Sequence, residues 1–189
     1  EARNGVGYFG NLTPWKGIEV LLRASKKLID ADVEFELRVH GGAPFQGERF
    51  IEEIDALFDE TSARVTRLGP YRPEDVPRLM QAVDWVVVPS VWWENAPLVI
   101  AEARQHKRPI IASGVGGMAE AVKDGVDGLH ARRGDASDLA RLMQNAAGDA
   151  DLHRRLVANN RPPPSAAAVA ERYLRLFAKL KAAPQTVAA

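Results

Sequence analysis

Two carboxylates flank the start of a predicted helix in the middle of the chain. Glu94 follows an apolar run at 85–88 that is typical of a buried strand, and Glu102 comes after seven intervening residues. Asn95 can cap the helix, and Pro97 suits its first turn because a missing N–H costs little there. The first N–H groups of a helix are unpaired and its dipole is positive at that end, so the segment favours anions. The pattern indicates a phosphate-bearing ligand whose hydroxyls meet two carboxylates.

The composition limits the other classes of function. The chain has 189 residues, with 25 Lys and Arg against 25 Asp and Glu, so its net charge gives no general attraction to nucleic acid or to an anionic membrane. It contains no cysteine, which excludes disulfides, zinc–thiolate sites and thiol catalysis. The length suits one domain, and no signal peptide or long apolar span is visible. We expect a cytoplasmic protein, and because a strand follows Glu1 almost directly we expect a fragment of a longer one.

Short apolar runs and helical spacings alternate along the chain. Strands are predicted at 6–9, 33–39, 65–68, 85–88, 109–112 and 128–131. Helices are predicted between them at 18–28, 50–58 and 73–81, after Asn95 and after Gly117, and then at 135–147, where Asp135 or Ser137 can start the helix. A last amphipathic helix is predicted at 169–180, followed by a frayed tail at 183–189. The alternation predicts an α/β fold, a Rossmann-like doubly wound parallel six-stranded sheet with helices on both faces.

Sheets of this kind bind ligands beyond the carboxyl ends of their strands. The loops at those ends are 10–16, 40–42, 69–71, 90–94 and 114–117. Four of the five contain glycine, which lets a ligand approach the backbone closely. The candidate carboxylate Glu94 therefore lies at the edge of the sheet where a ligand is expected.

The chain resembles the C-terminal, nucleotide-binding half of a GT-B glycosyltransferase, and most of all the retaining family GT4, the glycosyl transferases group 1. The resemblance covers roughly residues 5–180. It is carried by the Glu94 and Glu102 pair within Ser-x-Trp-x-Glu-Asn-x-Pro-Leu-Val-Ile-x-Glu-Ala, and by four further pieces: Gly10-Asn11-Leu12, Lys16-Gly17, Gly116-Gly117 with Glu120, and Asp124-Gly125 with Gly128.

The resemblance implies an enzyme of the hexosyltransferase type (EC 2.4) as part of a longer chain. Residues 1–182 would be the donor-binding domain, and the N-terminal acceptor domain would be absent. The expected ligand is a UDP-, GDP- or ADP-sugar, whose sugar passes to a hydroxyl of an acceptor sugar or lipid-linked glycan, with no metal or cofactor. The expected partner is the chain's own N-terminal domain, through which alone a membrane would be contacted, and no nucleic acid is expected. The isolated domain is expected to be inactive and to come from a bacterium.

The resemblance also assigns roles to single residues. It implies that Glu94 contacts hydroxyls of the donor sugar near the reacting carbon, that Lys16 meets the diphosphate, and that Glu102 binds the ribose hydroxyls. Eight positions return about 80° around a helix, so Glu94 and Glu102 can face one cleft. Glu94 and Lys16 are the candidate catalytic residues. The remaining candidate donor-binding residues are Gly10, Asn11, Gly41, Tyr71, Asn95, Ala96, Pro97, Leu98 and Val99.

Two positions depart from the family pattern. Asn11 stands where the family has an arginine beside the diphosphate, and an uncharged donor makes a weaker bond to phosphate. Pro97 has no N–H, so Leu98 and Val99 would supply the amides that meet phosphate.

Several single positions stay open on the sequence alone. Tyr71 suits a nucleobase contact and core packing equally. Gly10 and Gly41 suit close approach or an ordinary turn. Trp92 and Trp93 flank the acceptor side, and Trp93 suits core packing somewhat better than a sugar pocket.

Three other functions fit parts of the pattern. A nucleotide-sugar epimerase or a non-catalytic nucleotide-sugar-binding module would have the same fold. A fragment of an NAD(P)-dependent oxidoreductase would account for the glycine-rich segment 114–119 and for Arg132-Arg133 as a phosphate site. The dinucleotide fingerprint belongs on the first strand, however, and 114–119 follows the fifth predicted strand.

Overall fold

The computed structural model describes residues 3–182, which contain a six-stranded, all-parallel sheet in the order β3-β2-β1-β4-β5-β6. Its strands are β1 (Gly5–Phe9), β2 (Glu36–His40), β3 (Val65–Gly69), β4 (Trp85–Val88), β5 (Ile110–Ser113) and β6 (Gly128–Ala131). The strand order reverses between β1 and β4, which pair with Val6 opposite Trp85. The predicted fold class is confirmed, and each of the six predicted strands overlaps an observed one.

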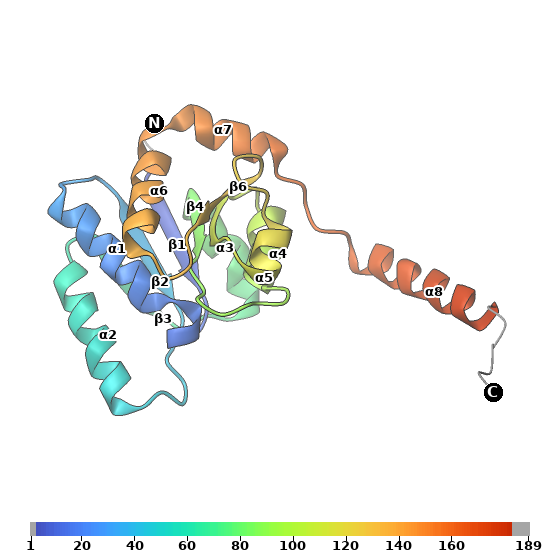
Figure 1. Cartoon of the computed structure of the whole chain (residues 1–189), viewed down its shortest axis with the longest axis horizontal. Helices are drawn as coiled ribbons and strands as arrows, with labels where there is room; N and C mark the ends of the chain where they lie inside the picture. The colour runs from blue at the N-terminus through green and yellow to red at the C-terminus, as the bar shows by residue number, and fades with distance from the viewer. Residues whose placement is uncertain (1–2, 183–189) are drawn as a thin grey trace.

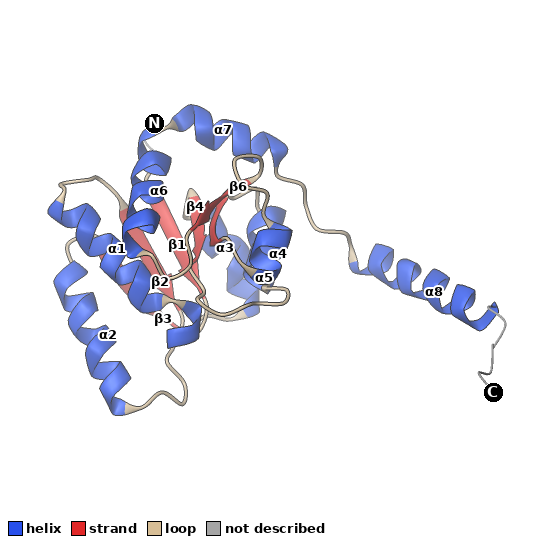
Figure 2. Cartoon of the chain, viewed as in Figure 1, coloured by secondary structure: helices blue, strands red, loops and turns tan. Residues whose placement is uncertain are grey.

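Helices cover both faces of the sheet (Figures 1 and 2). One face carries α1 (Ile18–Asp30), α2 (Glu48–Thr61) and α6 (Ala136–Gly148). The other carries α3 (Val76–Gln81), α4 (Leu98–Gln105) and α5 (Gly116–Ala121). The described chain also has the 3₁₀ turns η1 (Pro14–Lys16) and η2 (Pro73–Asp75), and the helices α7 (Ala150–Asn159) and α8 (Ala166–Ala182).

The central strand β4 shows why its sequence is continuously apolar. Successive side chains of a strand point to opposite faces, so Trp85 and Val87 join the core under α1 and α6, while Val86 and Val88 join the core under α3, α4 and α5. All four side chains are buried. A strand covered on both faces has no solvent side, and a polar residue here would lose its hydration.

Aspartate side chains begin the two helices that follow β6. The carboxylate of Asp135 accepts hydrogen bonds of 2.9 Å from the backbone N–H groups of Ser137 and Asp138, so of the two predicted starts of α6 the structure uses Asp135. The carboxylate of Asp149 accepts a 2.8 Å bond from the Leu152 N–H and begins α7, a helix that the sequence analysis did not predict.

The predicted cap of α4 is wrong. The helix begins at Leu98, Pro97 occupies the N-cap position instead of the first turn, and Asn95 is exposed and makes no capping bond. The reason lies in the start of α5, where the Gly117 N–H donates a 2.6 Å hydrogen bond to the Glu94 carbonyl oxygen. This bond holds the loop against α5 and leaves Asn95 two residues ahead of the N-cap.

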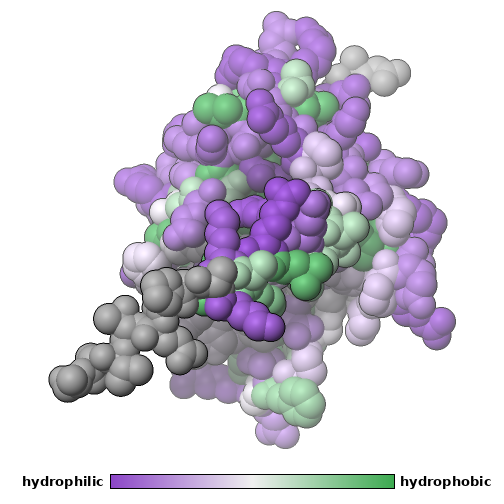
Figure 3. Space-filling view, turned by 90° about the vertical axis from the view of Figure 1, so that its right-hand side faces the viewer, coloured by the Kyte–Doolittle hydropathy of each residue, from purple (hydrophilic) through white to green (hydrophobic). Residues whose placement is uncertain are grey.

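The last helix, α8, projects away from the sheet and its covering helices (Figure 1). It spans the predicted amphipathic segment and carries six exposed apolar side chains, namely Val169, Tyr173, Leu174, Leu176, Phe177 and Leu180. Figure 3 views the molecule from this side and shows hydrophobic side chains at the surface among hydrophilic ones. The predicted tail at 183–189 lies outside the described residues. Within the described part of the chain, no helix combines the length and apolar character that crossing a membrane requires.

Substitution of Gly17 tests how closely the loop before α1 packs against the backbone at Pro89. Its φ is +71°, and a Cβ at this position would lie 2.0 Å from the Pro89 carbonyl oxygen. We expect Gly17→Ala to lower the free energy of unfolding by about 2 kcal/mol or more, because left-handed strain and overpacking add. Urea denaturation at constant m-value measures the change.

Gly148→Ala is the matched control, since nothing lies within 4 Å of a Cβ added there. At this helical position we expect a change of no more than about 1 kcal/mol, in the stabilising direction. Equal effects of the two substitutions would contradict the close contact at Gly17.

Candidate functional site

Lys16 and Glu94 are in direct contact although 78 positions separate them in the chain. The Lys16 ammonium donates a 2.6 Å hydrogen bond to Glu94 Oε1, and the Ser90 hydroxyl donates a 2.9 Å bond to the same oxygen. The Glu94 side chain is 15% exposed and that of Lys16 is 39% exposed. Both bonds fall on Oε1, and among the described residues none donates to Oε2. The pair therefore presents a carboxylate oxygen and a cation at the sheet edge, side by side.

The loops that carry this pair are held together by their backbones. Lys16 is the last residue of η1, whose start is capped by the Thr13 hydroxyl. The Val91 N–H donates a 2.9 Å hydrogen bond to the Trp15 carbonyl oxygen, which ties the loop after β4 to η1. Because β1 and β4 are neighbours in the sheet, these loops leave it side by side. The positions of the two charges are thus fixed by the fold.

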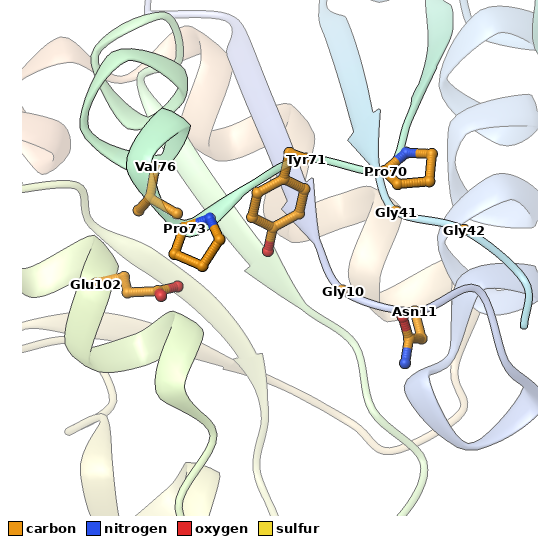
Figure 4. A pocket seen from close by; sticks show the side chains of 9 residues that line it. All are labelled: Gly10, Asn11, Gly41, Gly42, Pro70, Tyr71, Pro73, Val76 and Glu102. Carbon is orange, nitrogen blue, oxygen red and sulfur yellow. The ribbon is translucent and has the colours of Figure 1, made fainter.

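A depression of about 300 Å³ lies beyond the carboxyl ends of β1, β2 and β3, and the residues after β1 that line it, Gly10 and Asn11, belong to the loop that leads to Lys16. Figure 4 shows the nine residues that line it, which are Gly10, Asn11, Gly41, Gly42, Pro70, Tyr71, Pro73, Val76 and Glu102. The carboxylate of Glu102 and the hydroxyl of Tyr71 point into the same space (Figure 4). Gly41 has a φ of +150°, and a Cβ there would lie 1.8 Å from the Gly10 carbonyl oxygen, so the floor requires glycine.

Tyr71 both lines this depression and packs against neighbouring rings. Its ring lies edge-on to Phe9 at 5.9 Å and to His40 at 6.0 Å, and those two rings stack at 5.0 Å. Burial lowers the pKa of His40, and nearby Arg38 and Arg78 lower it further. The packing and ligand-facing interpretations of Tyr71 are therefore compatible, since the ring rests on an aromatic cluster that leaves its hydroxyl in the depression.

Glu102 is half-buried in this depression and forms no ion pair with any residue that the structure describes. Burial raises the pKa of its carboxyl group, and His106 opposes this only in part. Burial also raises the pKa of the Tyr71 hydroxyl, and the nearby Glu102 raises it further. A carboxylate kept in partial desolvation gains by accepting hydrogen bonds from a ligand's hydroxyl groups.

The predicted site residues near the start of α4 lie elsewhere. Asn95, Ala96, Pro97 and Leu98 line a separate depression of about 400 Å³, together with residues of α5 and of the segment before α8. Val99 lines neither depression and packs partly against the core. Leu98 and Val99 are the first two residues of α4, so their N–H groups have no partner within the helix. The predicted residues thus line more than one depression, and α4 contributes to two of them, through Glu102 and through Leu98.

Thr13 and Trp15 were not predicted as site residues, and Trp92 was predicted only to flank the acceptor side. Thr13, Trp15 and Trp92 line a third depression of about 530 Å³ together with Lys16 and Glu94. The position of Trp15 directly before Lys16 was the sequence signal that could have identified it as a site residue. Trp92 and Trp93 are 56% and 62% exposed, so the interpretation of Trp93 as core packing is wrong, and Trp93 does not line this depression either. Among the described residues, no group of three or more side chains is arranged to hold a metal ion.

Glu102→Gln tests the electrostatics of the depression. A raised folded-state pKa means that the native protein binds its proton more tightly than the unfolded chain does. The tighter proton binding stabilises the folded state fully at pH values below 4.5, the ordinary pKa of a glutamate. This stabilisation is lost as the pH rises through the raised pKa of the folded state. The variant lacks this loss, so its stability relative to the wild type should increase from about pH 4 to about pH 7. Urea unfolding at both pH values measures it.

Glu52→Gln, on the exposed side of α2, controls for the loss of one negative charge. A stability difference between wild type and Glu102→Gln that is the same at both pH values would contradict the desolvation of Glu102.

Comparison with known proteins gives one family. The family model of glycosyl transferases group 1 matches residues 3–149. A D-inositol 3-phosphate glycosyltransferase of Nocardia farcinica is 36% identical over 158 residues, which make up 80% of this chain and 34% of that protein. One from Mycobacterium sp. (strain KMS) is 37% identical over 156 residues, again 80% of this chain and 34% of that protein. The chain thus spans about a third of the length of the curated relatives it matches.

Solved structures agree with the observed fold. The Anabaena protein HepE, crystallised in complex with UDP, is 26% identical and superposes with a TM-score of 0.80 over 96% of this chain and 50% of that one. The C-terminal domain of a group 1 glycosyl transferase from Francisella tularensis, at 20% identity, has the same fold, with a TM-score of 0.72 over 91% of this chain and 87% of that one. With the family model matching most of its length, the chain belongs to the glycosyl transferases group 1.

Proposed function

We propose that this chain is the donor-binding domain of a retaining glycosyltransferase, which transfers a sugar from a nucleoside diphosphate to an acceptor hydroxyl. The observation that carries the proposal is the 2.6 Å contact between Lys16 and Glu94 at the ligand-binding edge of the sheet. A cation and a mostly buried carboxylate side by side suit a ligand that offers phosphate and sugar hydroxyls together. Membership of a glycosyltransferase family supports the same conclusion.

The loop from β1 to α1 supports a specific placement of the ligand. Its first residues, Gly10 and Asn11, line the depression of Glu102, while Thr13 and Lys16 line the depression of Glu94. A nucleoside diphosphate sugar is an extended molecule with the diphosphate between its two ends. We place the nucleoside with Tyr71 and Glu102, the diphosphate along this loop, and the sugar beside Glu94.

In this placement the protein stabilises the leaving group. The bond between the anomeric carbon and the β-phosphate oxygen breaks, the acceptor oxygen attacks from the same face, and its proton passes to the departing phosphate oxygen. Lys16 would stabilise the negative charge that develops on the diphosphate, and the first N–H groups of α4, those of Leu98 and Val99, would face the same charge. Glu94 would hold the sugar hydroxyls in position.

We assign sugar transfer to a protein longer than this chain. The matched segment makes up only 34% of the first curated relative, so about two thirds of that relative has no counterpart here. We propose that an N-terminal domain supplies the acceptor site and that the chain by itself binds donor without transferring sugar. An epimerase or a non-catalytic module would use the same donor site, and sugar-epimerised product without acceptor would identify the former.

An NAD(P)-dependent oxidoreductase is disfavoured by the glycine-rich segment itself. The Gly117 N–H, which a dinucleotide fingerprint would direct at a pyrophosphate, donates instead to the Glu94 carbonyl oxygen. The segment also follows β5 and not β1.

Lys16→Ala tests the diphosphate site. HepE was crystallised with UDP and with UDP-glucose, so we expect UDP to bind this chain more tightly than GDP or ADP. Loss of one charge-assisted hydrogen bond should weaken UDP binding by roughly tenfold to a hundredfold. Isothermal titration calorimetry measures the affinities.

Lys27→Ala, an exposed lysine at the far end of α1, is the control and should leave the affinity unchanged. Absence of binding by UDP, GDP and ADP to the folded wild-type chain would contradict the proposal. Sugar transfer from UDP-glucose to an added acceptor by the chain alone would contradict the assignment of the acceptor site to another domain.

Asn11→Arg tests the departure from the family pattern. Asn11 is exposed and lines the depression of Glu102, and its carbonyl oxygen accepts a 2.8 Å bond from Tyr8, so its backbone position does not depend on its side chain. An added guanidinium should tighten UDP binding by about tenfold, with a steeper salt dependence. Uridine, which lacks phosphate, is the control ligand and should bind both proteins equally. An unchanged affinity for UDP would show that the diphosphate does not reach position 11.

A further inference from the structure

Two exposed indole rings lie beside the Lys16–Glu94 pair. Trp15 is 62% exposed and Trp92 is 56% exposed. Their ring centroids are 5.8 Å apart at an interplanar angle of 71°, an edge-to-face contact. We call Trp15 and Trp92 the indole pair. Large exposed aromatic side chains next to a charged site indicate a ligand contact more often than they indicate packing, because packing would have buried them.

The backbone beneath the indole pair is pre-organised. The Trp15 carbonyl oxygen accepts hydrogen bonds from the N–H groups of Val91 at 2.9 Å and Trp92 at 3.4 Å. Trp15 itself lies in η1, between the capping Thr13 and the left-handed Gly17. Two rings on a fixed backbone lose little conformational entropy when a ligand packs on them.

The depression that the pair lines has a mixed chemistry. Its volume is about 530 Å³, and Thr13, Lys16 and Glu94 complete its wall. An apolar protein segment placed here would bury the ammonium and the carboxylate without new hydrogen bonds, which is unfavourable. A pyranose ring fits better, because its C–H groups form apolar faces and its hydroxyls form a polar rim. An indole can pack on such a face while Glu94 Oε2 accepts from the rim.

We propose that the indole pair is a sugar-stacking surface that holds one pyranose ring beside Glu94. The inference rests on the proposed function, because it assigns part of that site to a sugar. The ring is either the sugar of the nucleotide donor or a sugar of the acceptor, and the two sources share the recognition chemistry. The pair thus contributes affinity to the sugar and none to the nucleotide.

The test separates the sugar from the nucleotide. The 189-residue chain is titrated with UDP, with UDP-glucose, UDP-galactose and UDP-N-acetylglucosamine, and with methyl glucoside in the presence and absence of UDP. Saturation-transfer NMR on the same samples reports which sugar protons contact the protein. The variants are Trp15→Ala, Trp92→Ala and Trp92→Phe. The control is Trp93→Ala, which removes an equally exposed indole, 62% exposed, that does not line the depression.

We expect UDP affinity to stay within about twofold in every variant. The affinity for at least one sugar-containing ligand should fall by roughly tenfold in both Trp15→Ala and Trp92→Ala. Saturation transfer to the C–H protons of the sugar ring should be lost in the same two variants. Trp92→Phe should retain most of the binding, and Trp93→Ala should behave as wild type. The arm that responds, UDP-sugar or methyl glucoside, identifies the source of the ring.

The inference would be overturned if Trp15→Ala and Trp92→Ala bound the UDP-sugars and methyl glucoside as tightly as the wild type. It would also be overturned if the wild type bound UDP but gained no affinity from an attached sugar and did not bind methyl glucoside. Both results leave the proposed donor site intact. If no nucleotide binds but methyl glucoside binds and depends on the indole pair, the sugar surface stands and the proposed function fails. If no ligand binds, both fail.

Discussion

The ion pair between Lys16 and Glu94 is the interaction on which the site depends. It requires the loop after β1 and the loop after β4 to meet, and they meet because β1 and β4 are adjacent at the point where the strand order reverses. Gly17 permits the approach, since any side chain there would collide with the Pro89 carbonyl group. A lysine and a glutamate at the same sequence separation on another strand order would be two unrelated surface charges.

One short loop connects the two ends of the site. The stretch from Gly10 to Lys16 passes from the depression of Glu102 to the depression of Glu94, so it presents backbone, amide and ammonium groups along one path. This arrangement matches the order of groups in a nucleoside diphosphate sugar. The Glu102 end offers a half-buried carboxylate, and the Lys16 end offers a cation. The indole pair lies at the charged end, where we propose that the transferred sugar binds.

The site contains an incompletely solvated carboxylate and two glycines with positive φ, and it rests on an apolar core. Glu102 is kept half-buried with a raised pKa, and Gly17 and Gly41 adopt backbone angles that other residues avoid. These features all lie at the carboxyl edge of the sheet. The core beneath that edge is continuous and apolar, with Trp85 and Ile111 fully buried among the helices. The sheet therefore supports loops whose positive-φ positions are filled by glycine, which is the usual division between scaffold and site.

The fold could be predicted from the sequence because apolar periodicity and glycine at strand ends are local signals, and they indicated six parallel strands with Glu94 after the fourth. Lys16 was singled out by the resemblance to a family and not by these signals. The start of α4 could not be predicted, because the Gly117 N–H reaches across from α5 to hold Glu94 and displaces the expected cap at Asn95. Nor could the division of the candidate residues among three depressions, since α4 separates side chains that are neighbours in sequence. Sequence by itself determined the fold class and supplied Glu94, Glu102 and Lys16 as candidates. Tertiary structure decided which of them touch, because contact between residues 78 positions apart depends on strand order and loop packing and leaves no periodic trace in the chain.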